Sequence, residues 1–109
     1  MPQAYKVLGQ IAPSATTATA IYTVPSATEA VVSSGSVCNR AGTAATFRLS
    51  VRPDGASLAN QHYLVYDANL SANDTIILTI GVTMDATDVL EAYASSGDLT
   101  FHAYGSEIT

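Results

Sequence analysis

Short runs of β-branched and aromatic residues, separated by turn signals every 8–12 residues, are the feature that most restricts the fold of this chain. No segment keeps a helical period over ten residues. Short, regularly spaced strands are typical of all-β sandwiches and barrels. We expect eight strands, at residues 4–10, 18–24, 29–38, 44–52, 62–68, 74–81, 88–95 and 98–107. In 109 residues they predict one antiparallel β-sandwich domain, 1–109, with a jelly-roll-like topology.

Alternation of apolar and polar residues assigns the two faces of three predicted strands, because successive side chains of a strand point to opposite sides. We predict inner rows of Phe47, Leu49 and Val51; Ile76, Leu78 and Ile80; and Leu99, Phe101 and Ala103. The outer rows then hold Arg48 and Arg52, Ile77, and His102 with Tyr104. The segment 88–95 is ambiguous, since Glu91 shares a face with Val89 and Tyr93. If this shared face turns inward the strand buries Glu91, and if it turns outward the strand exposes Tyr93.

The charge of the chain argues against two classes of partner and favours a structural role. Four basic and nine acidic residues give a net charge of −5. Nucleic acids and anionic membranes are bound mainly through Lys and Arg, so we expect neither as a partner. Charged residues make up 12% of the chain, about half the roughly 25% usual in soluble domains. A subunit held in an assembly tolerates such a surface better than a free monomer does.

Three of the four basic residues lie in one stretch, residues 37–55. If 29–38 and 44–52 pair as a hairpin closed by NRAGT, two of these arginines lie on its outer face and the third lies at its end. Two interpretations remain open: surface pairs with Asp54, Asp67 or Asp74, or a protein interface, where arginine is enriched. The predicted interface comprises Arg40, Arg48, Arg52, Asp54 and Tyr104. The loop 53–61 is the best candidate for contacting a neighbour.

Signals for catalysis are absent from the sequence. His62 and His102 are predicted on strands and have no nucleophile motif near them, so we expect no enzymatic activity, no catalytic residues and no cofactor. Asp85, Asp88 and Glu91 are close enough in sequence to hold a hard cation, but the EF-hand spacing is missing. Such acids more often cap a turn, face solvent or pair with an arginine, so we predict no metal site. Whether these three residues hold an ion is a question that the sequence leaves open.

The start of the chain, MPQAYKVLGQ, has no basic segment followed by an apolar run, so we expect no secretory signal. No window approaches the roughly 18 apolar residues that a membrane-spanning helix requires. We therefore expect synthesis in a cytoplasm without export by the usual signal.

The chain resembles small virion proteins of tailed bacteriophages, cyanophages among them, in the segments YKVLGQ, TVPSATEAVVSSGSVCNRAGTAATFRLSVRPDG, LANQHYLVYD, NDTIILTIGVTMDATDVLEAYAS and LTFHAYGSEI. The resemblance spans nearly the whole chain and implies an all-β structural protein of the virion. Its nearest functional analogy is a capsid decoration, or cement, protein that forms a homotrimer and binds the major capsid protein. A tail, baseplate or fibre-attachment module is the alternative. A carbohydrate-binding sandwich ranks lower, because the chain has no Trp and its six Tyr are scattered along the sequence.

Overall fold

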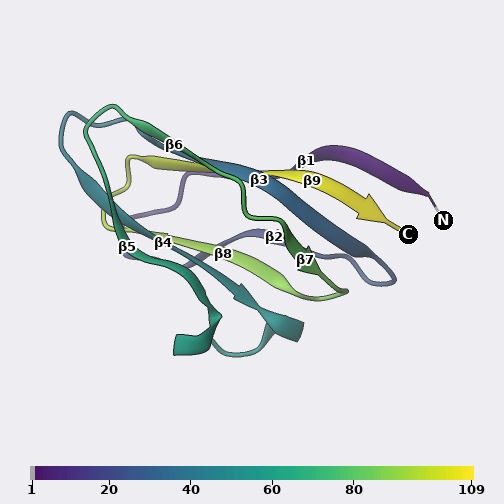
Figure 1. The fold of residues 1–109 in the computed structure, drawn as a ribbon. Coiled ribbons are helices and arrows are strands. Elements are labelled where there is room, and N and C mark those ends of the chain that lie inside the picture. Colours follow the sequence, from purple (N-terminus) through teal and green to yellow (C-terminus); the bar gives the residue numbers. More distant parts are fainter. Residues whose placement is uncertain (1) are drawn as a thin grey trace.

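The computed structural model describes residues 2–109 and confirms an all-β chain (Figure 1). Its strands are β1 (Gln3–Ile11), β2 (Thr19–Thr23), β3 (Glu29–Asn39), β4 (Ala45–Arg52), β5 (Tyr63–Leu70), β6 (Thr75–Leu78), β7 (Val82–Met84), β8 (Val89–Ala94) and β9 (Leu99–Ile108). Two single 3₁₀ turns, η1 (Pro53–Gly55) and η2 (Asn60–His62), lie between β4 and β5. No helix within residues 2–109 has the length and apolar character needed to cross a membrane.

The predicted strand 74–81 is interrupted in the structure. β6 ends at Leu78, and β7 begins at Val82 and pairs further along β3. Gly81 between them has a φ of +57° and donates its N–H to the carbonyl of Ser33, 3.4 Å away. Ser33 is the residue at which the pairing of β3 with β9 shifts its register. The edge strand therefore breaks where its neighbour β3 is irregular.

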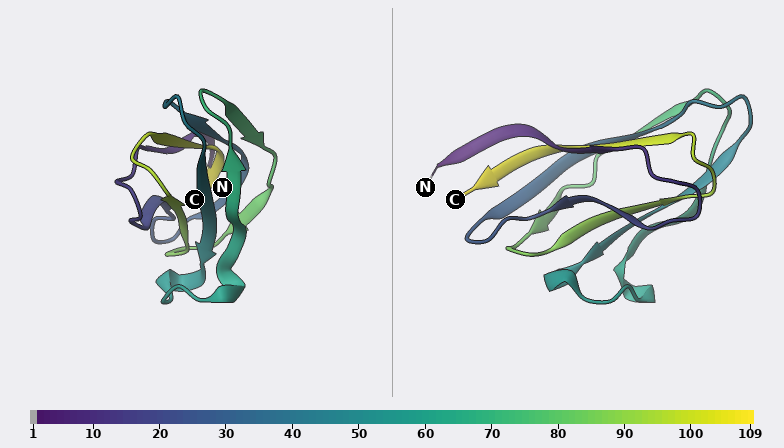
Figure 2. Two further views of the ribbon diagram at one scale, coloured as in Figure 1. Left: turned by 90° about the vertical axis from the view of Figure 1, so that its left-hand side faces the viewer. Right: turned by 180° about the vertical axis from the view of Figure 1, so that it is seen from behind.

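The strands form two antiparallel sheets, which Figure 2 shows as separate layers. Sheet A has the order β1-β9-β3-β6, with β7 also paired to β3, and sheet B has the order β2-β8-β4-β5. With β6 and β7 counted as one interrupted strand, this is the order of a jelly roll. The hairpin considered between 29–38 and 44–52 does not form, because β3 and β4 lie in different sheets. Residues 40–44 cross from one layer to the other.

Apolar rows from both sheets meet between the layers and confirm the predicted faces. Phe47, Leu49, Leu99, Phe101 and Ala103 are buried, and the rings of Phe47 and Phe101 pack edge to face, 6.1 Å apart. Val51, Ile76, Leu78 and Ile80 are partly buried and pack against this core. Ile77 points outward and is 68% exposed. The alternation in the sequence therefore placed the core correctly.

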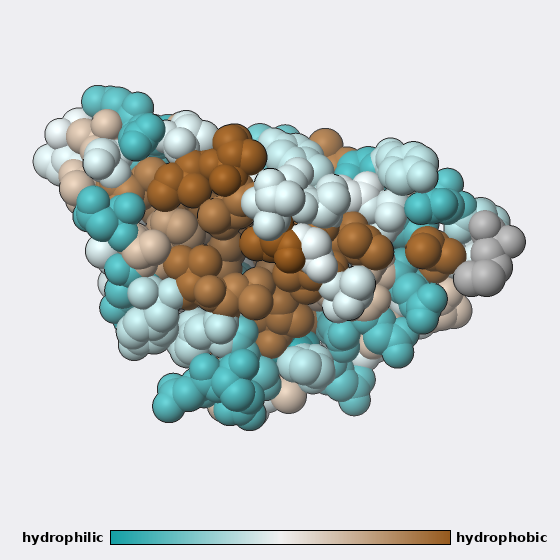
Figure 3. Space-filling view, in the orientation of Figure 1, coloured by the Kyte–Doolittle hydropathy of each residue, from teal (hydrophilic) through white to brown (hydrophobic). Residues whose placement is uncertain are grey.

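The two long sides of the sandwich differ. On one side β1 approaches β2 so closely that a Cβ at Gly9 would lie 2.1 Å from the carbonyl oxygen of Ile21. On the other side β5 and β6 are the outermost strands of their sheets, and apolar side chains show between them as a broad band in Figure 3. We call this band the apolar seam; it consists of Val51, Val65, Ala68, Ile76, Leu78, Ile80 and Val82.

Candidate interaction surfaces

Arg48 lies at the centre of the outer face of sheet B, where a β-bulge surrounds it with partners. On one side it pairs with Tyr93 of β8. On the other side the register between β4 and β5 shifts, so that Tyr66 and Asp67 together oppose this one residue. Asp67 has a φ of +52°, and such bulges redirect side chains. The bulge brings both β5 side chains to the arginine.

The contacts of Arg48 satisfy its charge within the chain. Its Nε and Nη2 donate to the two carboxylate oxygens of Asp67 at 2.6 and 3.3 Å. The guanidinium carbon lies 4.2 Å from the ring centre of Tyr66 and 4.4 Å from that of Tyr93. The hydrogen bonds from Arg48 lower the pKa of Asp67 below its usual value. The pair with Asp67 is one of the surface pairs that the sequence suggests.

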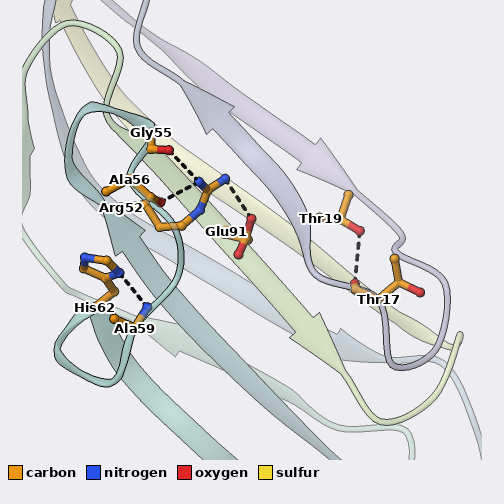
Figure 4. Close-up of polar contacts among 8 residues, drawn as sticks. All are labelled: Thr17, Thr19, Arg52, Gly55, Ala56, Ala59, His62 and Glu91. Atoms are coloured by element: carbon orange, nitrogen blue, oxygen red, sulfur yellow. Dashed lines mark hydrogen bonds and ion pairs between the residues drawn. The ribbon is translucent and has the colours of Figure 1, made fainter.

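Arg52 and Glu91 form a second pair on the same face (Figure 4). Arg52 Nη2 donates to Glu91 Oε2 at 3.1 Å, and Nη1 donates to the carbonyls of Gly55 and Ala56 at 3.1 and 2.9 Å. Glu91 is only 8% exposed, although it lies in the outer row of β8. The ambiguous strand is thus resolved with Leu90 inward and its acid buried beside an arginine.

The acids at the neighbouring turns bind backbone and side-chain donors. Asp88 accepts hydrogen bonds from the N–H groups of Asp54 and Asp85 at 2.8 and 2.9 Å, and the hydroxyl of Thr87 donates to Asp54. Glu91 instead faces Arg52. Within residues 2–109 no group of three or more His, Cys, Asp or Glu is arranged to hold a metal ion. Two of these contacts also hold Asp54, near the start of the loop 53–61, against the turn before β8.

The five residues of the predicted interface do not form one surface. Arg48 and Arg52 share the outer face of sheet B, with Asp54 just beyond its end. Arg40 lies at the crossover after β3, where its Nη2 donates to the carbonyl of Gly97 at 3.0 Å. Tyr104 belongs to β9 in sheet A, and its hydroxyl lies 3.0 Å from His102 Nδ1. Each of the three arginines has an acceptor within the chain.

A groove crosses the outer face of sheet B and encloses a cavity of about 250 Å³. We call it the sheet B groove; its lining residues are Thr16, Ala18, Arg48, Ser50, Leu58, Tyr63, Glu91, Ala92 and Tyr93. The rings of Tyr63 and Tyr66 meet edge to face, 4.8 Å apart, at its β5 side. Three of the six tyrosines, Tyr63, Tyr66 and Tyr93, therefore gather here, although the six are spread along the sequence. Sheet order and the β5 bulge bring them together, and neither has a sequence signal.

The outer face of sheet A, which we call the neutral face, has a different character. The strand registers place on it residues such as Tyr5, Val7, Ile77 and Tyr104, together with Ser, Thr and Gln side chains. Tyr5 is 81% exposed and Val7 is 50% exposed. Among the paired strand residues of sheet A, Glu29 is the only carboxylate on this face and no Lys or Arg lies on it, and Asp85 lies beside Glu29 and Thr83 at its edge. Large apolar groups are therefore exposed there without charge.

Comparison with known proteins gives no family assignment, because no family model and no curated protein matches the sequence.

Proposed function

We propose that this chain is a structural protein of a tailed-phage virion, a capsid decoration protein that forms a homotrimer and stabilises contacts between major capsid subunits. The resemblance of nearly the whole sequence to small phage virion proteins supports the virion role. The observation that carries the assembly role is the neutral face, because in a chain with a net charge of −5 the strands of sheet A place only one carboxylate, that of Glu29, on it. A jelly roll suits a shell protein, although the fold alone does not decide function.

In this proposal the apolar seam is the contact between copies of the chain. Its side chains continue directly into the core, and interfaces of obligate oligomers resemble a protein core cut in half. Three seams facing a common axis bury their apolar groups against one another. The seam residues carry no charge, so their contact adds no like-charge repulsion between acidic subunits. Closed cyclic symmetry then matches a local three-fold position on a capsid.

The neutral face is assigned to the capsid protein. It mixes tyrosine and aliphatic groups with hydroxyls, and charged residues are depleted at the centres of protein interfaces. Docking through this face across a joint between capsid subunits makes separation of those subunits expose the buried surface again. Binding to the assembled state alone stabilises that state by mass action. The decoration protein would act as a clamp in this way.

Light scattering coupled to size-exclusion chromatography tests the self-association directly. We expect wild-type protein to have a mass of three times 11.3 kDa. Ile80→Glu, which places a carboxylate in the seam, should shift the mass to that of the monomer. Ile77→Glu is the matched control, because Ile77 lies on β6 just before Ile80 in the chain but points to the neutral face. It should leave the trimer intact and weaken only attachment to capsids.

A wild-type monomer at high protein concentration would contradict the proposed trimer whatever the variants do. If both variants were monomers, the contact between copies would not be specific to the apolar seam, which would contradict the proposed trimer interface. The alternative, a tail or baseplate module, predicts few copies at one end of the particle, whereas a decoration protein covers the head.

A further inference from the structure

We propose that the sheet B groove binds a neutral saccharide ring. The site lies on the sheet opposite the neutral face, so the proposal does not depend on the virion role, and docking through sheet A would leave the groove exposed to solvent.

The shape of the groove suits a small ring. Ser50 and Glu91 are cross-strand partners on the floor, and Tyr63 pairs with Ser50 on the next strand. Leu58, from the loop between η1 and η2, and Thr16, from the β1–β2 connection, form the rims. The volume of about 250 Å³ is just below the roughly 300–1,000 Å³ of sites for drug-sized ligands. One or two sugar rings fit this scale better than a peptide does.

The electrostatics of the groove favour a ligand without net charge. Each arginine is paired with one carboxylate, Arg48 with Asp67 and Arg52 with Glu91. No unpaired cation therefore remains to attract phosphate. The aromatic faces of Tyr66 and Tyr93, which would otherwise suit a cationic ligand, already hold the guanidinium of Arg48.

The polar groups that remain include both donors and acceptors. Arg48 uses Nε and Nη2 to bind Asp67, and Glu91 uses Oε2 to bind Arg52. Within residues 2–109, Arg48 Nη1, Glu91 Oε1 and the Ser50 hydroxyl make no hydrogen bond. A sugar hydroxyl both donates and accepts, so adjacent hydroxyls satisfy a carboxylate and a guanidinium together. The C–H face of the ring can pack on Tyr63, which lines the same groove and does not hold the guanidinium. Apolar walls with a few convergent polar groups are the usual composition of a ligand site.

Both rims are held in place before any ligand binds. Arg52 fastens the loop through the carbonyls of Gly55 and Ala56, and the N–H of Ala59 donates to His62 Nδ1 at 3.0 Å (Figure 4). On the opposite rim, the N–H of Thr16 donates to the carbonyl of Ala94 at 2.8 Å. A preformed site avoids the entropy cost of ordering loops on binding.

The test is an NMR titration of the full chain, labelled with ¹⁵N, with D-glucose, D-galactose, D-mannose and N-acetylglucosamine as separate probes. We expect at least one sugar to give saturable shifts at the amides of Ser50, Glu91 and Tyr93, with a Kd of about 1 mM, a typical affinity for a ligand with few contacts. Inorganic phosphate and choline serve as charged probes and should give no saturable shift at these amides. Absence of saturation with all four sugars, or saturation with a charged probe alone, would overturn the proposal.

Two tyrosine variants provide the matched comparison. Tyr63→Ala removes a wall of the groove and should weaken sugar binding by about tenfold or more, equivalent to about 1.4 kcal/mol. Tyr5→Ala removes an exposed tyrosine from the opposite sheet and should leave the Kd unchanged. If the amide spectrum shows that Tyr63→Ala is unfolded, Ser50→Ala, which removes only the floor hydroxyl, should still weaken binding severalfold. Wild-type affinity in the folded groove variants would refute the site.

Discussion

Glu107 connects the two sheets through a single carboxylate. It lies on β9 of sheet A, and its Oε1 pairs with Lys6 Nζ of β1 at 2.5 Å. Its Oε2 accepts a hydrogen bond from the hydroxyl of Tyr22, a buried residue of β2 in sheet B. The hydrogen bonds from Lys6 and then Tyr22 lower the pKa of Glu107 below its usual value. Burial, with a contribution from Glu107, raises the pKa of Tyr22 above its usual value.

The lowered pKa of Glu107 predicts a specific pH dependence of stability. A carboxyl with a depressed folded-state pKa stabilises fully above its unfolded pKa, about 4.3, and loses that contribution as the pH falls toward the folded value. At pH 7, Glu107→Gln should therefore lower the free energy of unfolding by about 2 kcal/mol, typical of hydrogen bonds to a charged group. Urea unfolding of both proteins should show this gap shrinking as the pH falls below about 4. A gap independent of pH, or an equal one for Glu29→Gln, would contradict the assignment.

At the level of strands, β3 and β9 approach each other closely at Gly105. A Cβ at this position would lie 1.8 Å from the carbonyl oxygen of Val31, beside the register shift between Val32 and Ser34. Backbone atoms cannot move aside as a flexible side chain does, so any larger residue must separate the two strands.

Gly105→Ala should consequently destabilise the protein by about 3 kcal/mol or more, the upper end of the usual cost of overpacking. Gly42→Ala is the matched control, because no atom lies within 4 Å of a Cβ built there. Chemical denaturation should show a large loss for the first variant and almost none for the second. Similar values for both would mean that β9 does not pass β3 as closely as described.

The alternation of residues predicted the strands and their faces well, because burial of one face imposes a period of two that is visible in the sequence. It was informative for β4, where Phe47 and Leu49 are inside and Arg48 is outside. It gave no information on sheet order, since strands of both sheets have the same period. For that reason the sequence could not exclude a β3–β4 hairpin, which the structure does not form, although both strands were located correctly.

The geometry of the sheet B groove depends on features that have no local signal in the sequence. The bulge that turns Tyr66 and Asp67 toward Arg48 is set by the pairing of β4 with β5, not by a motif. The burial of Glu91 depends on Arg52 and on the loop that follows it. The sequence identified Asp67 as one of three candidate partners of the arginines, and only the structure selects it for Arg48.

In the molecule as a whole, each sheet presents a surface of a different character. The sandwich is elongated, 45 × 27 × 19 Å, and both termini lie at one end, where the N–H of Thr109 donates to the carbonyl of Pro2 (Figure 1). Sheet A presents the neutral face, sheet B presents the tyrosines and paired arginines, and the apolar seam lies along the side between them. Such a division allows one face to dock, the seam to join copies and the other face to remain accessible.

Cryo-electron microscopy of virions tests the proposed role most directly. We predict trimers of the sandwich repeated over the head at local three-fold positions, with sheet A against the capsid protein, the seams at the trimer axis and the sheet B groove facing solvent. Density for the protein confined to the tail, or sheet B packed against the shell, would contradict the account.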